Sequence, residues 1–264
     1  MSTLDIIDSH FHQWNLEKQT LPWLETEPST LKRSFSVHEL MRQYEQLEDV
    51  RLLGLVHVEA DCEDPSEEHL LVRLIKTCVP VFGIVSRAKL SAEMDILADS
   101  NGVREVLHTP STKPGRCLES SFLSGLELLS SFGLPFDAVV RPEEIPHIAE
   151  ASRLVPDTSI VLNHIGNISA LTSENMRNLR EFADTPNSFC KLSGIPVDEP
   201  DLAREMLESV KNTFGTDRLL FASNWPVGGV GEAVAQHVRL VRDVFGDNPA
   251  VFKHNASAVY RLGV

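Results

Sequence analysis

Cysteine is scarce in this sequence, and its spacing excludes two common uses of the residue. The four cysteines, Cys62, Cys78, Cys117 and Cys190, are scattered, with no CxxC pair and no metal-finger spacing. So few cysteines over 264 residues indicate reduced thiols and argue against a disulfide framework. We therefore expect a cytoplasmic protein.

Long hydrophobic runs and positive charge are also lacking. No apolar run approaches the ~18 residues that a membrane span needs, and the start, MSTLDIIDSH, has no signal-peptide pattern. The 24 Lys and Arg residues against 38 Asp and Glu give a formal net charge of -14, which would repel nucleic acid. The expected partner is a small-molecule substrate, with no membrane and no nucleic acid involved.

Short apolar runs rich in Val, Ile and Leu are what the sequence does contain. Such runs are typical of parallel strands buried on both faces. The eight runs span residues 4–12, 50–60, 79–90, 103–109, 134–142, 159–166, 188–195 and 219–227. Amphipathic stretches separate them, so we predict that strand and helix alternate eight times. This pattern indicates an α/β fold, a single (β/α)8 TIM barrel domain over residues 1–264.

Several of the intervening helices carry end signals. In residues 36–48, Ser36 followed by Glu39 predicts a capping box at the helix start. Residues 199–215 and 230–246 each stop at a glycine, which predicts a glycine C-cap. No glycine-rich phosphate loop follows the first apolar run, and this counts against a doubly wound open sheet.

Polar residues gather where the apolar runs stop. The active site of a TIM barrel lies at the C-terminal ends of its strands. The residues at these positions are His10, His12, His57, Glu59, Ser86, Arg87, Arg104, His108, Arg141, Asn163, His164, Lys191, Ser193, Ser223, Asn224 and Trp225. A barrel used only as a scaffold has little reason to carry them, so we predict an active site there.

His10, His12 and His164 are the strongest catalytic candidates. His10 and His12 are two residues apart, so on a strand they share a face, and His164 ends the sixth run. Three neutral imidazoles suit one divalent metal, zinc above all, with an open position for water. Without a metal, the same imidazoles could donate hydrogen bonds to a carbonyl oxygen. The residues leave both uses open.

The arginines suggest an acidic substrate. Arg87, Arg104 and Arg141 each suit a substrate carboxylate, which a guanidinium grips through two parallel bonds. Glu59, Lys191 and Trp225 are further candidates for substrate contacts. We therefore expect a small, carboxylated substrate.

Other interpretations of these residues remain open. Lys191 also suits an ion pair with Glu59, and Arg141 a pair with Glu143. We favour structural roles for His57, as a buried core residue, and for His108, as a loop residue. Trp23, in LPWLETEP, could line a homodimer contact or a lid over the pocket.

Six blocks of this sequence resemble a known family. The blocks IDSHFHQW, LPFDAVVRPEEI, LNHIG, KLSG, LLFASNWPV and NASAVYRL are similar to those of the amidohydrolase-related lactonases, barrel hydrolases of the amidohydrolase superfamily. The resemblance implies hydrolysis of a lactone or related cyclic carbonyl compound. It implies catalytic roles for His10, His12 and His164 and substrate binding by Arg104. Metal dependence varies within this family.

One position departs from the family pattern. Active lactonases usually carry aspartate in a block like SDWP, where this sequence has SNWP with Asn224. Asparagine cannot take a proton from the attacking water, although it can orient that water. We predict a hydrolase in which Asn224 positions the water. Either His164, His57 or Glu59 supplies the base, or a metal-bound hydroxide needs only a weak local base. The alternatives are a ligand-binding pseudoenzyme and a decarboxylase of the same superfamily.

Overall fold

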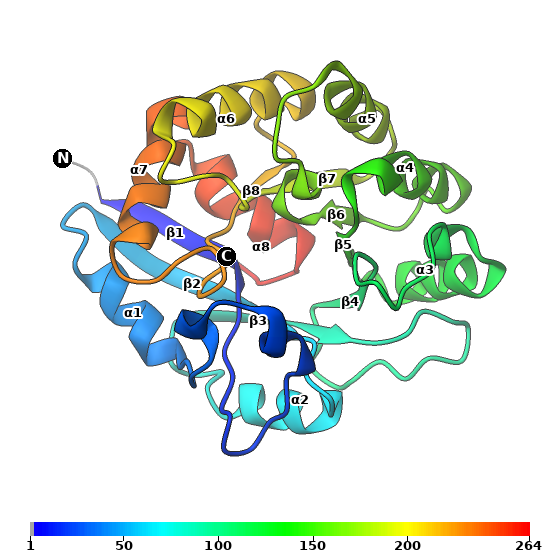
Figure 1. Ribbon diagram of the computed structural model, residues 1–264, viewed down its shortest axis with the longest axis horizontal. Coiled ribbons are helices and arrows are strands. Elements are labelled where there is room, and N and C mark those ends of the chain that lie inside the picture. Colours follow the sequence, from blue (N-terminus) through cyan, green and yellow to red (C-terminus); the bar gives the residue numbers. More distant parts are fainter. Residues whose placement is uncertain (1–2) are drawn as a thin grey trace.

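The computed structural model describes residues 3–264, which form one barrel of eight parallel strands surrounded by helices (Figure 1). Each strand pairs with the next in sequence order. The strands are β1 (Leu4–Phe11), β2 (Val50–Val58), β3 (Val81–Arg87), β4 (Gly102–Val106), β5 (Phe136–Val139), β6 (Ile160–Leu162), β7 (Ser188–Leu192) and β8 (Leu219–Phe221). The predicted TIM barrel is confirmed. Most strands stop earlier than predicted, because the polar residues at their ends lie in loops.

The barrel closes between β1 and β8 at the C-terminal ends of these strands. The Asn224 N–H donates to the His10 carbonyl at 2.8 Å, and the His12 N–H donates to the Trp225 carbonyl at 2.7 Å. Phe11 and Trp225 form a parallel bridge beside these bonds. The closure therefore places the segment after β8 directly against the histidine pair of β1.

Helices cover the outside of the barrel (Figure 1). They are α1 (Val37–Glu45), α2 (Pro65–Arg73), α3 (Ser120–Phe132), α4 (Ile145–Leu154), α5 (Ser173–Ala183), α6 (Pro200–Phe214) and α7 (Glu232–Phe245). A further helix, α8 (Asn255–Val259), lies at one end of the barrel. Gly215 and Gly246 end α6 and α7 at positive φ, as predicted. No helix in the described chain is long and apolar enough to cross a membrane.

The predicted capping box of α1 is wrong. The Ser36 side chain makes no capping hydrogen bond. The Glu39 carboxylate instead accepts two bonds from Arg33, at 2.9 and 2.5 Å. The guanidinium is a stronger donor for that carboxylate than the Ser36 backbone N–H, so the local charge pair replaces the cap.

Strand and helix do not alternate eight times, because residues 88–101 join β3 to β4 without a helix. Ser91, Asp95, Asp99 and Asn101 interrupt this segment, and such side chains compete with helical backbone bonds. Asp99 has φ of 67°, outside the helical region. The eighth helix, α8, lies beyond the last barrel unit instead.

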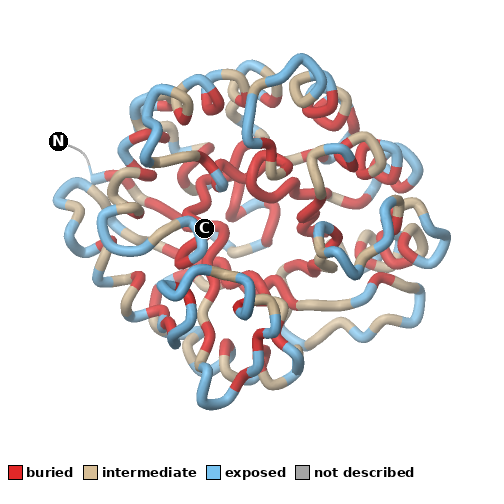
Figure 2. Tube along the Cα trace, viewed as in Figure 1, coloured by how far each residue is buried: buried red, intermediate tan, exposed pale blue. Residues whose placement is uncertain are grey.

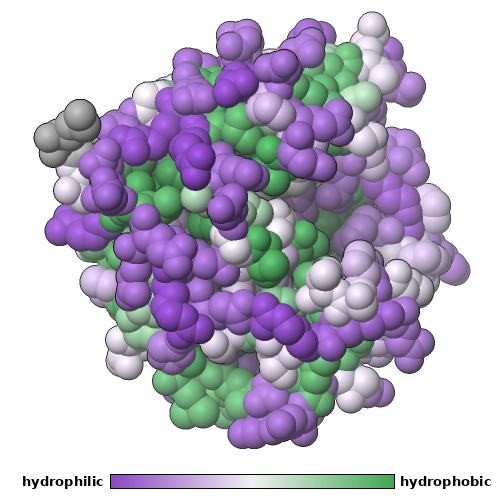
Figure 3. Space-filling model, turned by 60° about the vertical axis from the view of Figure 1, so that its left-hand side comes forward, coloured by the Kyte–Doolittle hydropathy of each residue, from purple (hydrophilic) through white to green (hydrophobic). Residues whose placement is uncertain are grey.

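The chain's C-terminal segment closes the opposite end of the barrel. Ala256, Val259 and Tyr260 pack with interior barrel residues such as Ile7 and Val161. Buried residues occupy the centre of the molecule in Figure 2, and the face in Figure 3 is mostly hydrophilic with smaller apolar patches.

Candidate active site

A cavity of about 370 Å³ opens at the C-terminal ends of the strands. His12, Arg104, His164 and Asn224 line it, which places four of the sequence-predicted residues in one site. Trp23 also lines it and is held by a hydrogen bond from its indole N–H to the Ala60 carbonyl at 2.8 Å. Trp23 therefore contributes to the wall of the pocket.

The structure brings the three histidines together. The ring centroids of His10 and His12 are 4.8 Å apart, and those of His10 and His164 are 4.6 Å apart. His10 is fully buried and does not line the cavity, so it lies behind His12 and His164. His10 is thus placed to support the other two rings.

Hydrogen-bond partners fix which nitrogen carries the proton in His12 and His10. The Val58 carbonyl can only accept, so His12 Nδ1, 2.8 Å away, is protonated and His12 Nε2 has a lone pair. The Lys191 ammonium can only donate, so His10 Nδ1, 3.2 Å away, is the acceptor. His10 Nε2–H then donates to His12 Nε2 at 3.1 Å.

Lys191 is held inside the barrel by Asp137, not by Glu59, so the predicted Lys191–Glu59 pair is wrong. Lys191 Nζ lies 2.5 Å from Asp137 Oδ2, and both side chains are fully buried. Tyr260 donates to the other oxygen of Asp137 at 2.7 Å. Burial lowers the pKa of Lys191 to about 8 against the opposing effect of Asp137, so the amine stays mainly charged at neutral pH.

The three imidazoles are neutral at neutral pH. Burial lowers the pKa values of His10, His12 and His164 well below the usual 6.5. Nearby cations, Lys191 and Arg104 among them, lower these pKa values further. Each ring therefore offers one donor and one acceptor, the state required for general base or electrophile roles.

Arg104 is anchored by Glu59. Its Nε donates to the Glu59 carboxylate, and its Nη2 donates to the Glu59 carbonyl at 2.5 Å. Among residues 3–264, Nη1 of Arg104 has no hydrogen-bond partner, and the side chain lines the cavity. Glu59 therefore orients Arg104, and Nη1 is left for a substrate oxygen.

His164 stands in a strained turn after β6. His164, Ile165 and Gly166 have φ of 54°, 51° and 69°, and a β-branched residue such as Ile165 rarely adopts this conformation. The turn directs the His164 ring to Ser193, with Nδ1 and Oγ 2.8 Å apart. A Cβ on Gly194 would lie 2.8 Å from His164 Cβ, so glycine is needed there. The strain is localised at the candidate site.

Asn224 lines the cavity and has a buried, unpaired side-chain oxygen. It has φ of 57°, and its buried Oδ1 has no hydrogen-bond partner in the described part of the chain. A buried acceptor beside a cavity suits a water or a substrate donor. Trp225 is fully buried against Phe35 and does not line the cavity, so it supports Asn224 from behind.

The donor set does not fit a divalent metal as it is arranged. Within residues 3–264, no three His, Cys, Asp or Glu side chains are positioned to hold one. The Lys191 ammonium keeps the proton of His10 on Nε2, the nitrogen that faces His12. A protonated nitrogen cannot ligate a metal.

The remaining candidates fall outside this cavity, with one exception. Arg87 pairs with Asp61 at 3.0 Å, and Arg141 pairs with Glu144 and not with the predicted Glu143. His57 is buried and burial lowers its pKa to about 3, as expected of a core histidine. His108, for which we favoured a purely structural role in a loop, does line the cavity.

Sequence reasoning missed Asp137 and Tyr260, which hold Lys191 in place. Asp137 had a signal, because it is a lone acid within the apolar run LPFDAVV. A buried carboxylate requires a partner, and a search for a buried cation would have led to Lys191. Tyr260 had no such signal, since its place under the barrel follows from the path of the C-terminal segment.

Comparisons with known proteins give a consistent result. A family model described as Amidohydrolase matches residues 7–262. "Amidohydrolase 2" from Bifidobacterium longum subsp. infantis has a similar structure, with a TM-score of 0.87, 34% identity and coverage of 98% of this chain and 100% of its own.

Two proteins from Burkholderia multivorans are also similar. L-fucono-1,5-lactonase is 24% identical over 84% of this chain and 82% of its own length. An amidohydrolase whose crystal structure contains bound zinc shares the fold, with a TM-score of 0.82, 21% identity and coverage of 97% and 99% of the two chains.

Proposed function

Because this chain belongs to the amidohydrolase family, we propose that it is a hydrolase that opens a small lactone or related cyclic ester. The proposal rests on one observation. Neutral His12 and His164 line the same cavity as Arg104 and Asn224. Neutral imidazoles and a guanidinium suit acyl transfer to water. The similarity to L-fucono-1,5-lactonase supports a lactone as the substrate.

His12 is the proposed general base. Val58 holds the proton on Nδ1, so Nε2 is the basic nitrogen. Its lone pair accepts from His10 Nε2–H at 3.1 Å in this structure, so that bond must break before His12 takes a proton from water. Asn224, which lines the cavity, orients the attacking water through its side-chain amide, so a carboxylate at this position is not required. His164 and Arg104 Nη1 donate to the substrate carbonyl oxygen, with Ser193 orienting the His164 ring.

The reaction then proceeds in two balanced steps. The water oxygen bonds to the carbonyl carbon, the carbonyl electron pair moves to oxygen, and His12 Nε2 takes the water proton. The ring C–O bond then breaks, the carbonyl re-forms, and the leaving alkoxide receives the proton from His12. The product is an open-chain hydroxy acid.

We propose that this chemistry uses no metal. The three histidines are the only zinc candidates that the sequence offered, and their present hydrogen bonds conflict with ligation. Metal analysis by mass spectrometry of protein purified without a histidine tag tests this part. We expect far less than one metal per chain and activity that survives dialysis against a chelator, whereas stoichiometric zinc or manganese would contradict it.

The experiment for the function is a lactone panel with wild type, His12→Gln and His38→Gln. His38 is exposed on α1 and serves as the matched control. We expect His12→Gln to lose ~10²–10⁴-fold in kcat, the usual effect of losing a general base. Asn224→Asp should give no strong gain, because His12 already supplies the base; a large gain would overturn this assignment.

The two rival functions predict different results in the same panel. A pseudoenzyme would bind lactones, as seen by calorimetry, without opening any of them. A decarboxylase would release carbon dioxide from an aromatic acid and leave lactones intact. Either result would contradict the proposed hydrolase.

A further inference from the structure

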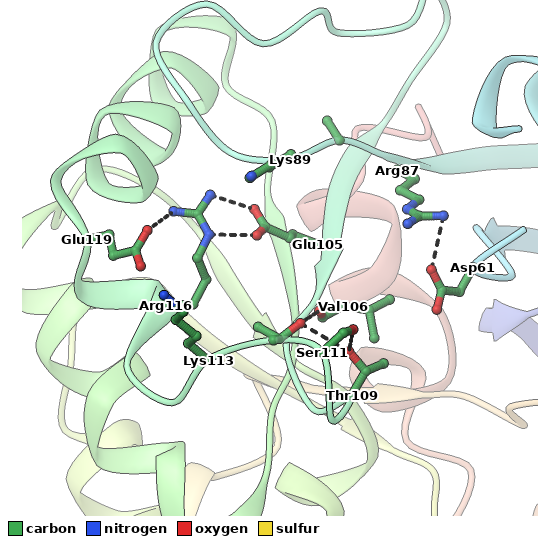
Figure 4. A pocket seen from close by; sticks show the side chains of 12 residues that line it. Asp61, Arg87, Lys89, Glu105, Val106, Thr109, Ser111, Lys113, Arg116 and Glu119 are labelled. Carbon is green, nitrogen blue, oxygen red and sulfur yellow. Dashed lines mark hydrogen bonds and ion pairs between the residues drawn. The ribbon is translucent and has the colours of Figure 1, made fainter. Parts of the chain in front are cut away.

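A second cavity of about 470 Å³ lies beside the first one (Figure 4). Asp61, Val106 and Thr109 line both cavities, so the two adjoin at the barrel mouth. The second cavity is formed by the ends of β3 and β4 and by the loop before α3. A ligand that fills the catalytic cavity could therefore extend into it.

The three carboxylates of the second cavity are paired with two arginines, which leaves one negative charge unbalanced. Arg116 binds both oxygens of Glu105, at 2.8 and 3.1 Å, and also reaches Glu119 at 3.0 Å. Arg87 pairs with Asp61 at 3.0 Å. All three acidic side chains that line the cavity are therefore in ion pairs.

Two lysines are left over. Lys89 and Lys113 line the cavity on either side of the Arg116–Glu105 pair (Figure 4). Within residues 3–264 neither ammonium group makes a hydrogen bond or an ion pair. With these two lysines the cavity lining has a net charge of +1, on a chain with a formal net charge of -14. An anionic group bound between them would form charge-assisted hydrogen bonds.

The neighbouring loop is built to hold its shape. The Arg141 guanidinium donates to the carbonyls of Thr109 and Thr112, at 2.6 and 2.8 Å. The hydroxyls of Thr109 and Thr112 lie 3.1 Å apart. The loop that carries Lys113 is therefore fixed from inside by Arg141, which explains why Arg141 is not free for a substrate.

We propose that the second cavity binds an anionic oxygen group, a carboxylate or a phosphate, at the far end of the lactone substrate. Lys89 and Lys113 bind this group while the ring occupies the catalytic cavity; the substrate part of this inference rests on the proposed function. The substrate class is then an elongated, acidic lactone. Recognition of the acid falls to the two lysines more than to Arg87, whose charge Asp61 already satisfies.

Direct binding tests the site without any turnover. Calorimetry at low salt would measure inorganic phosphate and, separately, succinate against wild type, the Lys89→Gln/Lys113→Gln variant and Lys18→Gln. Lys18 is exposed outside both cavities and controls for the loss of a positive charge. We expect the double variant to lose at least tenfold in affinity and Lys18→Gln to retain it.

The two probes identify the source of the anion. Tighter binding of phosphate than of succinate indicates a phosphorylated substrate, and the reverse order indicates a carboxylated one. Affinity that the double variant retains, or that Lys18→Gln loses equally, would overturn the site.

Kinetics separate this proposal from the proposed function. In the double variant, KM for an acidic lactone should rise at least tenfold relative to KM for a neutral lactone. An unchanged ratio in an active enzyme would overturn the subsite and leave the hydrolase intact. Lysine-dependent anion binding without hydrolysis of any lactone would instead support the subsite and contradict the hydrolase.

Discussion

Glu68 is a buried acid whose ionisation opposes folding. It lies on α2, where it accepts hydrogen bonds from the Ala60 N–H at 2.7 Å and the Cys62 thiol at 3.3 Å. Burial raises the pKa of Glu68 to about 8, and the charge of Glu59 contributes in the same direction. The folded-state pKa therefore exceeds the unfolded value of 4.5, so this stabilising contribution is complete below 4.5 and is lost as pH rises through about 8.

Glu68→Gln should remove this pH dependence. The amide keeps an acceptor for Ala60 but cannot ionise, so its stability relative to wild type should grow between about pH 4.5 and pH 8, by up to about 1.4 kcal/mol per pH unit. Urea unfolding across this range measures the difference. Glu67→Gln, at the neighbouring and less buried position, should show no such slope. A constant difference for Glu68→Gln would contradict the prediction.

The sequence identified the side chains of the candidate site better than it identified the residues that they contact. His10, His12, His164 and Arg104 could be found because strand ends meet at one rim of a barrel. The position of His10 behind the cavity could not be predicted, because the pairing register of β1 and β2 shifts between Asp8 and Phe11. The partner of Lys191 was also missed, since Asp137 lies on a strand that is distant in sequence.

At the scale of the structural elements, the conformation of the turn after β6 depends on its packing against the turn after β7. The His164 backbone and Cβ lie against Gly194, which follows β7 and has φ of 72°. A methyl group there would meet His164 Cβ at 2.8 Å and its backbone at 3.3 Å, both too close. The position of His164 is therefore set by the packing of two loops, which periodicity in the sequence does not reveal.

Gly194→Ala should lower both stability and activity. We expect a loss of about 2–4 kcal/mol, from the positive φ and the overpacking together, and a fall in kcat as His164 shifts. Gly115→Ala is the matched control, because Gly115 has φ of 77° with nothing within 4 Å of its added Cβ. That control should lose only about 1–2 kcal/mol and keep its kcat on a neutral lactone. Equal losses in the two variants would refute the role of the His164 contact.

The whole barrel was predictable because eight apolar runs repeat one pattern, and the missing glycine-rich loop counted against a doubly wound sheet, the other topology that such runs allow. The absent helix between β3 and β4 was not predictable from a repeating pattern, which treats all connections as equivalent. The packing of Tyr260 and its neighbours against the end of the barrel opposite the site was not predictable either, because the last helix could equally have packed outside.

The formal net charge of -14 affects the stability of the whole molecule, because like charges lie closer together in the folded chain than in the unfolded one. Raising NaCl from about 0.01 M to about 0.1 M shortens the Debye length from about 30 Å to about 10 Å. Calorimetry at pH 7 should then show a stability gain on the order of 1 kcal/mol, or about 2–4 °C in Tm. The same series near pH 5.1, the isoelectric point, is the control. There the net repulsion is absent, and salt screens only attractive surface pairs such as Arg51–Asp5, so Tm should stay level or fall. A rise of equal size at both pH values would show that salt acts through something other than net charge.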